Sequence, residues 1–163
     1  MPVLNENPFA VLTAIVAPAV LTNASSVLCL GTGNRIARVV DRTRVITKEL
    51  EGLGSDTAEY RLRVEQLKFL EIRAQLLFRA LRLLYASLGG FAASALVSVL
   101  GAALAYYGYQ FAFRAIAVVA LVVGVGAVTG LVVGCTLMVR ETRIAIRNIA
   151  DEAQTALARY SPR

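Results

Sequence analysis

The chain has 163 residues, of which 57% are hydrophobic and 17% are charged, and it carries a formal net charge of +6. It is large enough for one domain, but it is more apolar and less charged than a typical soluble domain. Three stretches contain no charged residue at all, namely 7–34, 83–113 and 115–139. This uneven distribution excludes a disordered chain and a disulfide-stapled secreted module, and it disfavours a soluble enzyme domain.

The chain lacks the side chains that most catalytic and metal sites require. It contains no His and no Trp, and its two cysteines, Cys29 and Cys135, both lie inside apolar stretches. Without His or a CxxC pair, the sequence offers no common zinc site and no base for a Ser or Cys nucleophile. The glycine-containing runs 31–34 and 52–55 lack the Lys-Ser/Thr ending of a phosphate loop, so we expect a hinge and a turn there. The sequence therefore predicts a protein that is not an enzyme and that holds no cofactor or metal.

The first predicted element is a membrane-spanning helix over about residues 9–30, which follows a short N-terminal segment. These 22 uncharged residues exceed the roughly 20 apolar residues needed to cross a bilayer core. Residues 1–8 contain neither Lys nor Arg, so we expect a retained anchor and not a cleaved signal peptide. We expect Pro18 to kink this helix, because proline removes a backbone hydrogen bond.

The inner half of this first span carries four polar side chains, which we call the polar stripe: Thr22, Asn23, Ser25 and Ser26. Two interpretations stay open. These groups either line a water-filled pore in a symmetric oligomer or form hydrogen bonds across helix contacts. No Asp, Glu, Lys, Arg or His lies at this depth, so neither a proton relay nor a charged ion site is predicted.

Residues 31–82 are predicted to form a cytoplasmic helical hairpin with its turn at 52–56. Apolar residues recur at alternating spacings of three and four in both arms, which is typical of helices that pack as a coiled coil. The first arm places Ile36, Val39, Thr43, Ile46, Leu50 and Leu53 on one face, and the second places Leu67, Leu70, Ala74, Leu77, Leu81, Leu84 and Leu88. Asp56 can cap the second helix, which we expect to continue to about residue 107.

The second and third spans are predicted over about residues 83–107 and 115–139, joined by a short turn outside the membrane. Both carry small residues four apart, a pattern that lets helix backbones approach closely in lipid. The positions expected at helix contacts are Gly126, Gly130 and Gly134 in the third span and Gly90, Ser94 and Ser98 in the second. Residues 140–163 are then predicted to form an amphipathic cytoplasmic helix.

The basic residues give the predicted orientation, because cytoplasmic segments of membrane proteins are enriched in Lys and Arg. Sixteen of the seventeen lie in 31–82 or 140–163, and only Arg114 lies between the second and third spans. The N-terminus is therefore expected outside and the C-terminus in the cytoplasm. Anionic lipid headgroups are the expected partners of the arginines nearest the spans, and no nucleic-acid partner is expected. These arginines are Arg35, Arg38, Arg79, Arg82, Arg140 and Arg143.

Four runs of residues in the N-terminal part are distinctive: Asn7-Pro8-Phe9, Ile15-Val16-Ala17-Pro18-Ala19, Leu21-Thr22-Asn23-Ala24-Ser25-Ser26 and Asn34-Arg35-Ile36-Ala37-Arg38-Val39-Val40-Asp41-Arg42. Through these runs, the sequence resembles a family of small bacterial membrane proteins known only as a domain of unknown function. The resemblance covers most of the chain and is strongest over residues 7–44. It implies a three-span protein of a bacterial inner membrane, and it brings no known activity.

As a whole, the sequence predicts an all-α integral membrane protein. Three transmembrane helices are expected, with the cytoplasmic hairpin and the C-terminal helix projecting as a coiled-coil-like rod. The first functional hypothesis is a non-enzymatic protein that assembles through helix packing into a homo-oligomer or a larger membrane complex. The alternative is an oligomeric channel for ions or small solutes, lined by the polar stripe.

Overall fold

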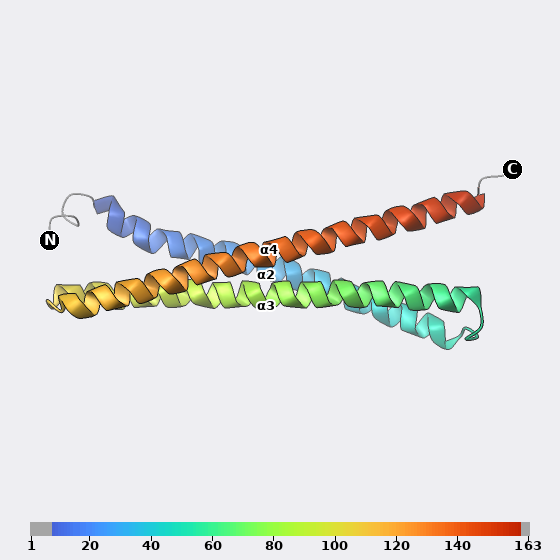
Figure 1. Ribbon diagram of the computed structural model, residues 1–163, viewed down its shortest axis with the longest axis horizontal. Helices are drawn as coiled ribbons and strands as arrows, with labels where there is room; N and C mark the ends of the chain where they lie inside the picture. Colours follow the sequence, from blue (N-terminus) through green and yellow to red (C-terminus); the bar gives the residue numbers. More distant parts are fainter. Residues whose placement is uncertain (1–7, 161–163) are drawn as a thin grey trace. The chain divides into compact units, whose positions relative to one another are not determined.

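Three long helices make up the part of the chain that the computed structural model describes, residues 8–160. They are α2 (Pro8–Glu51), α3 (Ala58–Tyr106) and α4 (Gln110–Tyr160), and no strand occurs within 8–160 (Figure 1). Side chains are described from residue 16 to residue 147, except at positions 18, 102, 105 and 110. The predicted all-α class is confirmed. The predictions for the N-terminal segment 1–7 and for the end of the last helix at 161–163 lie outside the described residues.

The first turn joins α2 to α3. The N–H of Gly52 donates to the carbonyl of Glu49, three residues back, which tightens the end of α2. The Thr57 hydroxyl accepts a hydrogen bond from the N–H of Tyr60 at 3.2 Å, which is the bond expected of a helix N-cap residue. The cap is therefore Thr57, and the prediction of Asp56 is wrong by one residue, because α3 begins one residue later than an Asp56 cap requires.

The second turn joins α3 to α4 and depends on Gly108. This residue has a φ of +82°, a left-handed conformation that is strained for any residue with a Cβ. The N–H of Tyr109 donates to the carbonyl of Leu104 at 3.1 Å, which is the long bond of a Schellman motif. Glycine at this point therefore ends α3 and lets the chain reverse into α4.

The Cα positions group into two compact units, and each helix contributes to both. Unit 1 comprises Met1–Gly31 and Arg82–Val133, and unit 2 comprises Thr32–Leu81 and Gly134–Arg163. Each unit therefore contains three helical segments, one from each helix.

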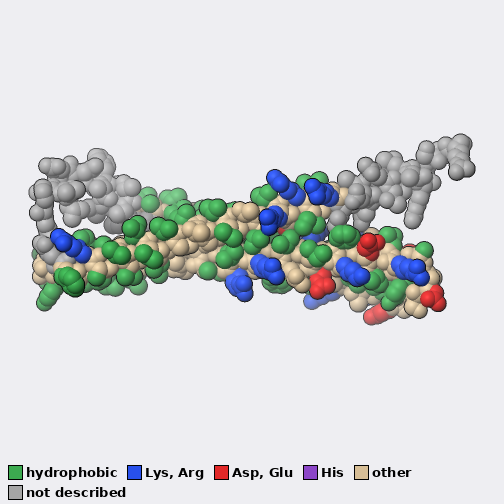
Figure 2. Space-filling model, in the orientation of Figure 1, with side chains coloured by type: hydrophobic (Ala, Val, Ile, Leu, Met, Phe, Trp, Pro, Cys, Tyr) green, Lys and Arg blue, Asp and Glu red, His purple; other side chains and the backbone are tan. Residues whose placement is uncertain are grey.

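The outer surface of unit 1 is apolar. Large side chains such as Val27, Leu96 and Leu121 are more than half exposed. In the described part of this unit, Arg82 and Arg114 are the only charged residues. On the face shown in Figure 2, charged side chains gather over unit 2, whereas unit 1 is covered mainly by hydrophobic side chains and backbone.

Two stretches of described helix are long and apolar enough to cross a membrane, Ala58–Gly101 in α3 and Phe111–Arg147 in α4. Only 17% and 11% of their most apolar windows are buried within the protein. An equally apolar helix in the core of a soluble protein is mostly buried, so these two helices point to a membrane protein. In the predicted first span, the side chains of residues 9–15 lie outside the described part.

Unit 2 has a core of large apolar side chains between α2 and α3. Val39 and Ile46 from α2 form a buried cluster with Leu70 and Leu77 from α3. Partly buried residues pack against this cluster, namely Ile36, Leu50, Leu67 and Ala74. All eight belong to the faces predicted from the three-four spacing, which therefore identifies the contact faces of this unit. In the amphipathic helix predicted over residues 140–163, the side chains from 148 onward lie outside the described part.

Candidate functional site

A buried carboxylate joins the three helical segments of unit 2. The side chain of Glu141 on α4 is only 2% exposed, and its two oxygens have different partners. Oε1 accepts a hydrogen bond from Nε of Arg73 on α3 at 2.8 Å, and it forms an ion pair with Nη2 of the same arginine at 2.8 Å. Oε2 lies 3.4 Å from Nη1 of Arg35 on α2. Together with Thr142, these three residues are called the Glu141 cluster below.

Hydroxyl groups extend the contact between α2 and α4. Nη1 of Arg35 also donates to Oγ1 of Thr142 at 2.9 Å, and that hydroxyl donates to the carbonyl of Met138 at 3.0 Å. One turn earlier on α2, the hydroxyl of the buried Thr32 lies 3.2 Å from Sδ of Met138. Polar groups therefore connect these two helices at two successive turns.

The contacts of the Glu141 cluster are suited to holding the three helical segments of unit 2 in position. Both carboxylate oxygens face guanidinium groups, so neither is free to bind a metal or to act as a base on a substrate. A charge buried with good hydrogen-bond partners is costly to separate from them, which fixes the positions of the helices that carry it. Within the described residues, no group of three His, Cys, Asp or Glu side chains could hold a metal ion. Cys29 and Cys135 are free.

Glu141 is not among the residues that the sequence pattern predicts, although a signal for it exists. It is the only acidic residue between Glu71 and Asp151, and it lies in a segment that is otherwise basic. A lone acid at the end of an apolar span indicates a paired base nearby. The identity of the base could not be read in advance, because the sequence does not say which side chains of α2 and α3 lie opposite it.

Two glycines predicted at helix contacts bring α3 and α4 together in unit 1. A Cβ added at Gly90 would lie 2.8 Å from the Cβ of Ala127 and 3.6 Å from its Cα. A Cβ added at Gly130 would lie 2.7 Å from Oγ of Ser87. Real Cβ atoms do not approach so closely, so a side chain at Gly90 would force the two helices to shift, whereas one at Gly130 would force the Ser87 hydroxyl to move.

The other small residues predicted at helix contacts have varied surroundings. Oγ of Ser94 donates to the carbonyl of Ala120 on the neighbouring helix at 3.0 Å. Ser98 instead bonds within its own helix, to the carbonyl of Ser94. The space beside Gly126 is open, and Gly134 is buried but belongs to unit 2.

The four residues of the polar stripe do not share one surface of unit 1. Ser25 is fully buried, and its hydroxyl has no hydrogen-bond partner among the described residues. Thr22 is half-buried, whereas Asn23 and Ser26 are exposed. The Ser26 hydroxyl donates to the carbonyl of Thr22 at 3.0 Å. At about 100° per residue, Ser25 and Asn23 are roughly 160° apart around α2, so they point in nearly opposite directions.

The arginines predicted to meet lipid headgroups are mostly exposed. Five of them are open to the surroundings of the protein: Arg38, Arg79, Arg82, Arg140 and Arg143. The sixth, Arg35, takes part in the Glu141 cluster, and its side chain remains 42% exposed. Arg35 therefore has a structural contact that the sequence does not predict, and it keeps a free side.

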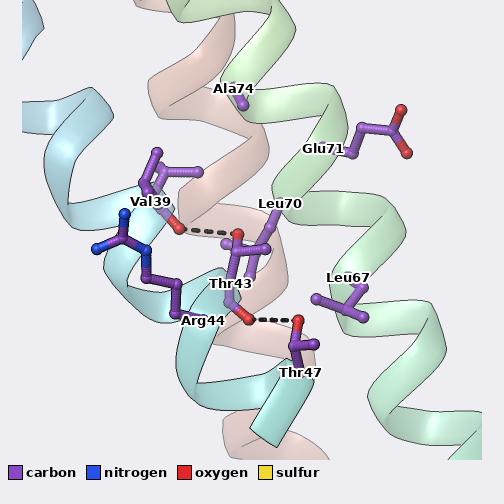
Figure 3. A pocket seen from close by; sticks show the side chains of 9 residues that line it. Val39, Thr43, Arg44, Thr47, Leu67, Leu70, Glu71 and Ala74 are labelled. Atoms are coloured by element: carbon purple, nitrogen blue, oxygen red, sulfur yellow. Dashed lines mark hydrogen bonds between the residues drawn. The ribbon is translucent and has the colours of Figure 1, made fainter.

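A groove of about 440 Å³ lies between α2 and α3 in unit 2 (Figure 3). Its lining is largely apolar, with Val39 and Thr43 on one side and Leu67 and Leu70 on the other. Figure 3 shows Glu71 pointing away from α2, and it shows the hydroxyls of Thr43 and Thr47 bonded to the backbone of their own helix. The groove offers no unbonded hydroxyl that would orient a ligand, so we assign it none.

Comparison with known proteins identifies one family. A family model described as a protein of unknown function (DUF2721) matches residues 15–150, which include the cores of both units. No curated protein and no solved structure matches the chain. The match confirms the resemblance drawn from the residues. Of the distinctive runs, Asn7-Pro8-Phe9 lies before the matched region.

Proposed function

For this chain, which belongs to the family of proteins of unknown function DUF2721, we propose a non-enzymatic role as an integral membrane protein that assembles by helix packing. It crosses the membrane three times and forms a homo-oligomer, or it joins a larger membrane complex as a scaffold. The observation that carries this proposal is the contrast within unit 1 between an apolar outer surface and glycine contacts between helices. Close backbone packing is what associates helices in lipid, where the hydrophobic effect between them is absent.

Besides the apolar stretches of α3 and α4, the proposal requires residues 9–30 of α2, the predicted first span, to cross the membrane. Within unit 1, Ser25 and Cys29 are buried, whereas Val20, Val27 and Leu30 on the other sides of α2 are exposed. A helix that packs beside two membrane-crossing helices and shows an apolar outer face suits the same hydrocarbon environment.

The distribution of charge supports a location in a bacterial inner membrane, with unit 2 and the C-terminus in the cytoplasm and the N-terminus outside. Basic residues concentrate in unit 2, and cytoplasmic segments attract such residues. The exposed arginines next to the spans then lie at the depth of anionic headgroups, which are the proposed lipid partners. Tyr106, Tyr107 and Tyr109 are exposed at the opposite turn, where aromatic residues suit a membrane–water interface.

The contacts described above favour an assembly protein over an enzyme or a channel. The one deeply buried charge among the described residues, Glu141, is engaged by two arginines and serves the alignment of helices. A pore lined by the polar stripe requires its four side chains to face one aqueous surface. In the protomer Ser25 is fully buried and points roughly 160° away from the exposed Asn23, so this alternative gains no support.

Topology and assembly can be tested on the full chain in bacterial membranes. Single cysteines at Gly54 and at Tyr107, each in a Cys29→Ala/Cys135→Ala background, should react with a membrane-impermeant maleimide from opposite sides. In intact cells we expect labelling at position 107 and not at 54, and labelling at both after permeabilisation. Chemical crosslinking followed by native mass spectrometry should give a species larger than the protomer. Equal labelling of both sites in intact cells, or a protomer with no partner at all, would contradict the proposal.

A further inference from the structure

The outward face of α2 in unit 1 carries a side-chain amide that forms no hydrogen bond with any described residue. Asn23 is exposed, and it lies roughly 160° around the helix from the buried Ser25. The neighbouring hydroxyl of Ser26 is engaged by the Thr22 carbonyl. Among the described residues, no hydrogen bond reaches the side-chain amide of Asn23. It therefore faces the surroundings of unit 1 and not its interior.

The depth of Asn23 makes this exposure costly. Asn23 precedes Leu30, the end of the first span, by seven residues, which corresponds to about 10 Å along the helix. A side-chain amide at that depth faces hydrocarbon, where no water can satisfy its two donors and its acceptor. Burying such an amide without hydrogen-bond partners is energetically costly. A stable position for this side chain requires a hydrogen-bond partner at the same depth.

The residues around Asn23 permit another helix to come close. Ala19 and Ser26 lie on the same side of α2, one turn before and one turn after Asn23, and both are exposed. Small side chains at such spacing let two backbones approach closely enough for side-chain amides to meet across the contact. Val20 and Val27 flank this face and supply apolar contact on its edge.

We propose that this face binds a second copy of the chain, through a hydrogen bond between Asn23 and Asn23 of the partner subunit. This inference rests on the proposed function, because it requires residues 9–30 to span the membrane. Copies inserted with one topology carry Asn23 at one depth, so each protomer supplies the partner that the other needs. An amide is both donor and acceptor, so the same group serves on both sides of a twofold contact. No other partner is guaranteed to offer a matching polar group at that depth.

The contact can be tested by disulfide crosslinking in native membranes. The full chain carries Ala19→Cys in the Cys29→Ala/Cys135→Ala background, and mild oxidation traps neighbouring copies as a covalent dimer. We expect efficient trapping when Asn23 is present and a fall in dimer association of about five- to thirtyfold with Asn23→Leu, which matches the strength of interhelical polar contacts in lipid. The matched control is Asn34→Leu, which makes the same change on the same helix outside the span and should leave trapping unchanged.

Measuring membrane insertion of the variants distinguishes a failure of the Asn23 contact from a failure of the proposed function. Leucine favours the bilayer more than asparagine does, so Asn23→Leu should insert at least as well as the original chain. Maleimide labelling of the same variants reports whether α2 crosses the membrane. Two outcomes overturn the Asn23 contact and leave the proposed function standing. In the first, the chain inserts but Ala19→Cys gives no disulfide-linked dimer. In the second, the dimer forms and Asn23→Leu does not reduce its amount. A chain whose α2 does not cross overturns both, and a crosslink to a different protein overturns the second copy as the partner.

Discussion

Unit 1 and unit 2 are built from the same three helices, yet they are held together by different side chains. In unit 1, glycine and small residues bring α3 and α4 together, and most large apolar side chains point outward, with Leu84 and Phe91 as buried exceptions. In unit 2, a cluster of large apolar side chains and the carboxylate of Glu141 are buried, and most described charged residues are exposed. The proposed position of unit 1 in the membrane and of unit 2 in water accounts for the difference. Water drives apolar side chains into a core, whereas lipid is as apolar as leucine and leaves close packing as the source of association.

The largest expected effect comes from removing a large side chain in the core of unit 2. Leu77 is fully buried, and Leu77→Ala should lower the free energy of unfolding by about 2–5 kcal/mol, through lost burial and the cavity left behind. Leu121 in unit 1 is 67% exposed, so Leu121→Ala removes a side chain that already faces the surroundings and should change stability by less than about 0.5 kcal/mol. Unfolding of the purified protein in detergent measures both. Equal losses for the two variants would remove the contrast between the units.

The Glu141 cluster should give the next largest effect. Glu141→Gln leaves two guanidinium groups without a carboxylate, which we expect to cost about 3 kcal/mol. This estimate lies at the low end for a buried ion pair, because Arg35 and Arg73 remain 42% and 27% exposed and water can solvate them in part. Hydrogen exchange should show faster exchange in unit 2 with little change in unit 1.

Glu71→Gln provides the matched control for this cluster. Glu71 is exposed, and its one hydrogen bond among the described residues is a long one of 3.4 Å, accepted from Gln75 on its own helix. Its substitution should change exchange in unit 2 very little, within about 0.5 kcal/mol of stability. If Glu71→Gln accelerates exchange as much as Glu141→Gln does, the effect belongs to net charge and not to the cluster.

Alanine substitutions at two glycines test whether α3 and α4 depend on close approach in unit 1. Gly90→Ala places a Cβ within 2.8 Å of Ala127 and should destabilise the helix contact by about 1–3 kcal/mol. Gly126→Ala meets open space, so it should be neutral or should stabilise α4 by up to about 1 kcal/mol through helix propensity. The thermal midpoints of the two variants in detergent should move in opposite directions or by clearly different amounts. Similar shifts for both would mean that the contact at Gly90 does not hold the helices together.

The sequence predicts helices and packing faces well, because both depend on local spacing. The three-four pattern identifies Val39, Ile46, Leu70 and Leu77 as contact residues, and they are the core of unit 2. The glycines are predicted only in part. Spacing by four places Gly126 and Gly130 on one face of α4, but only Gly130 has a close neighbour, the Ser87 hydroxyl, which a Cβ would displace. The spacing of residues predicts which of them share a helix face. It does not predict at which of these residues a neighbouring helix makes contact.

The candidate site is the part that sequence reasoning reaches least. The Glu141 cluster joins residues that are 68 and 106 positions apart, and no local pattern pairs them. The polar stripe is the opposite case, because its residues lie close together in sequence, and nevertheless Ser25 is buried whereas Asn23 is exposed. Neighbours on a helix are turned by about 100° from one another, so a run of polar residues spreads around the helix instead of forming one surface.

The smallest expected effect comes from substituting Ser25. This substitution tests whether Ser25 is a buried packing residue or part of the polar lining of a water-filled space. Its hydroxyl is fully buried and unpartnered among the described residues, so Ser25→Ala removes an unsatisfied group and should be neutral or stabilise unit 1 by up to about 1 kcal/mol. Ser94→Ala is the matched comparison, because it deletes a hydrogen bond to the Ala120 carbonyl and should cost about 1 kcal/mol. Thermal unfolding in detergent measures both. If Ser25→Ala costs as much as Ser94→Ala, the Ser25 hydroxyl has a partner such as a buried water, and the interior of unit 1 is wetter than a dry packed contact between helices.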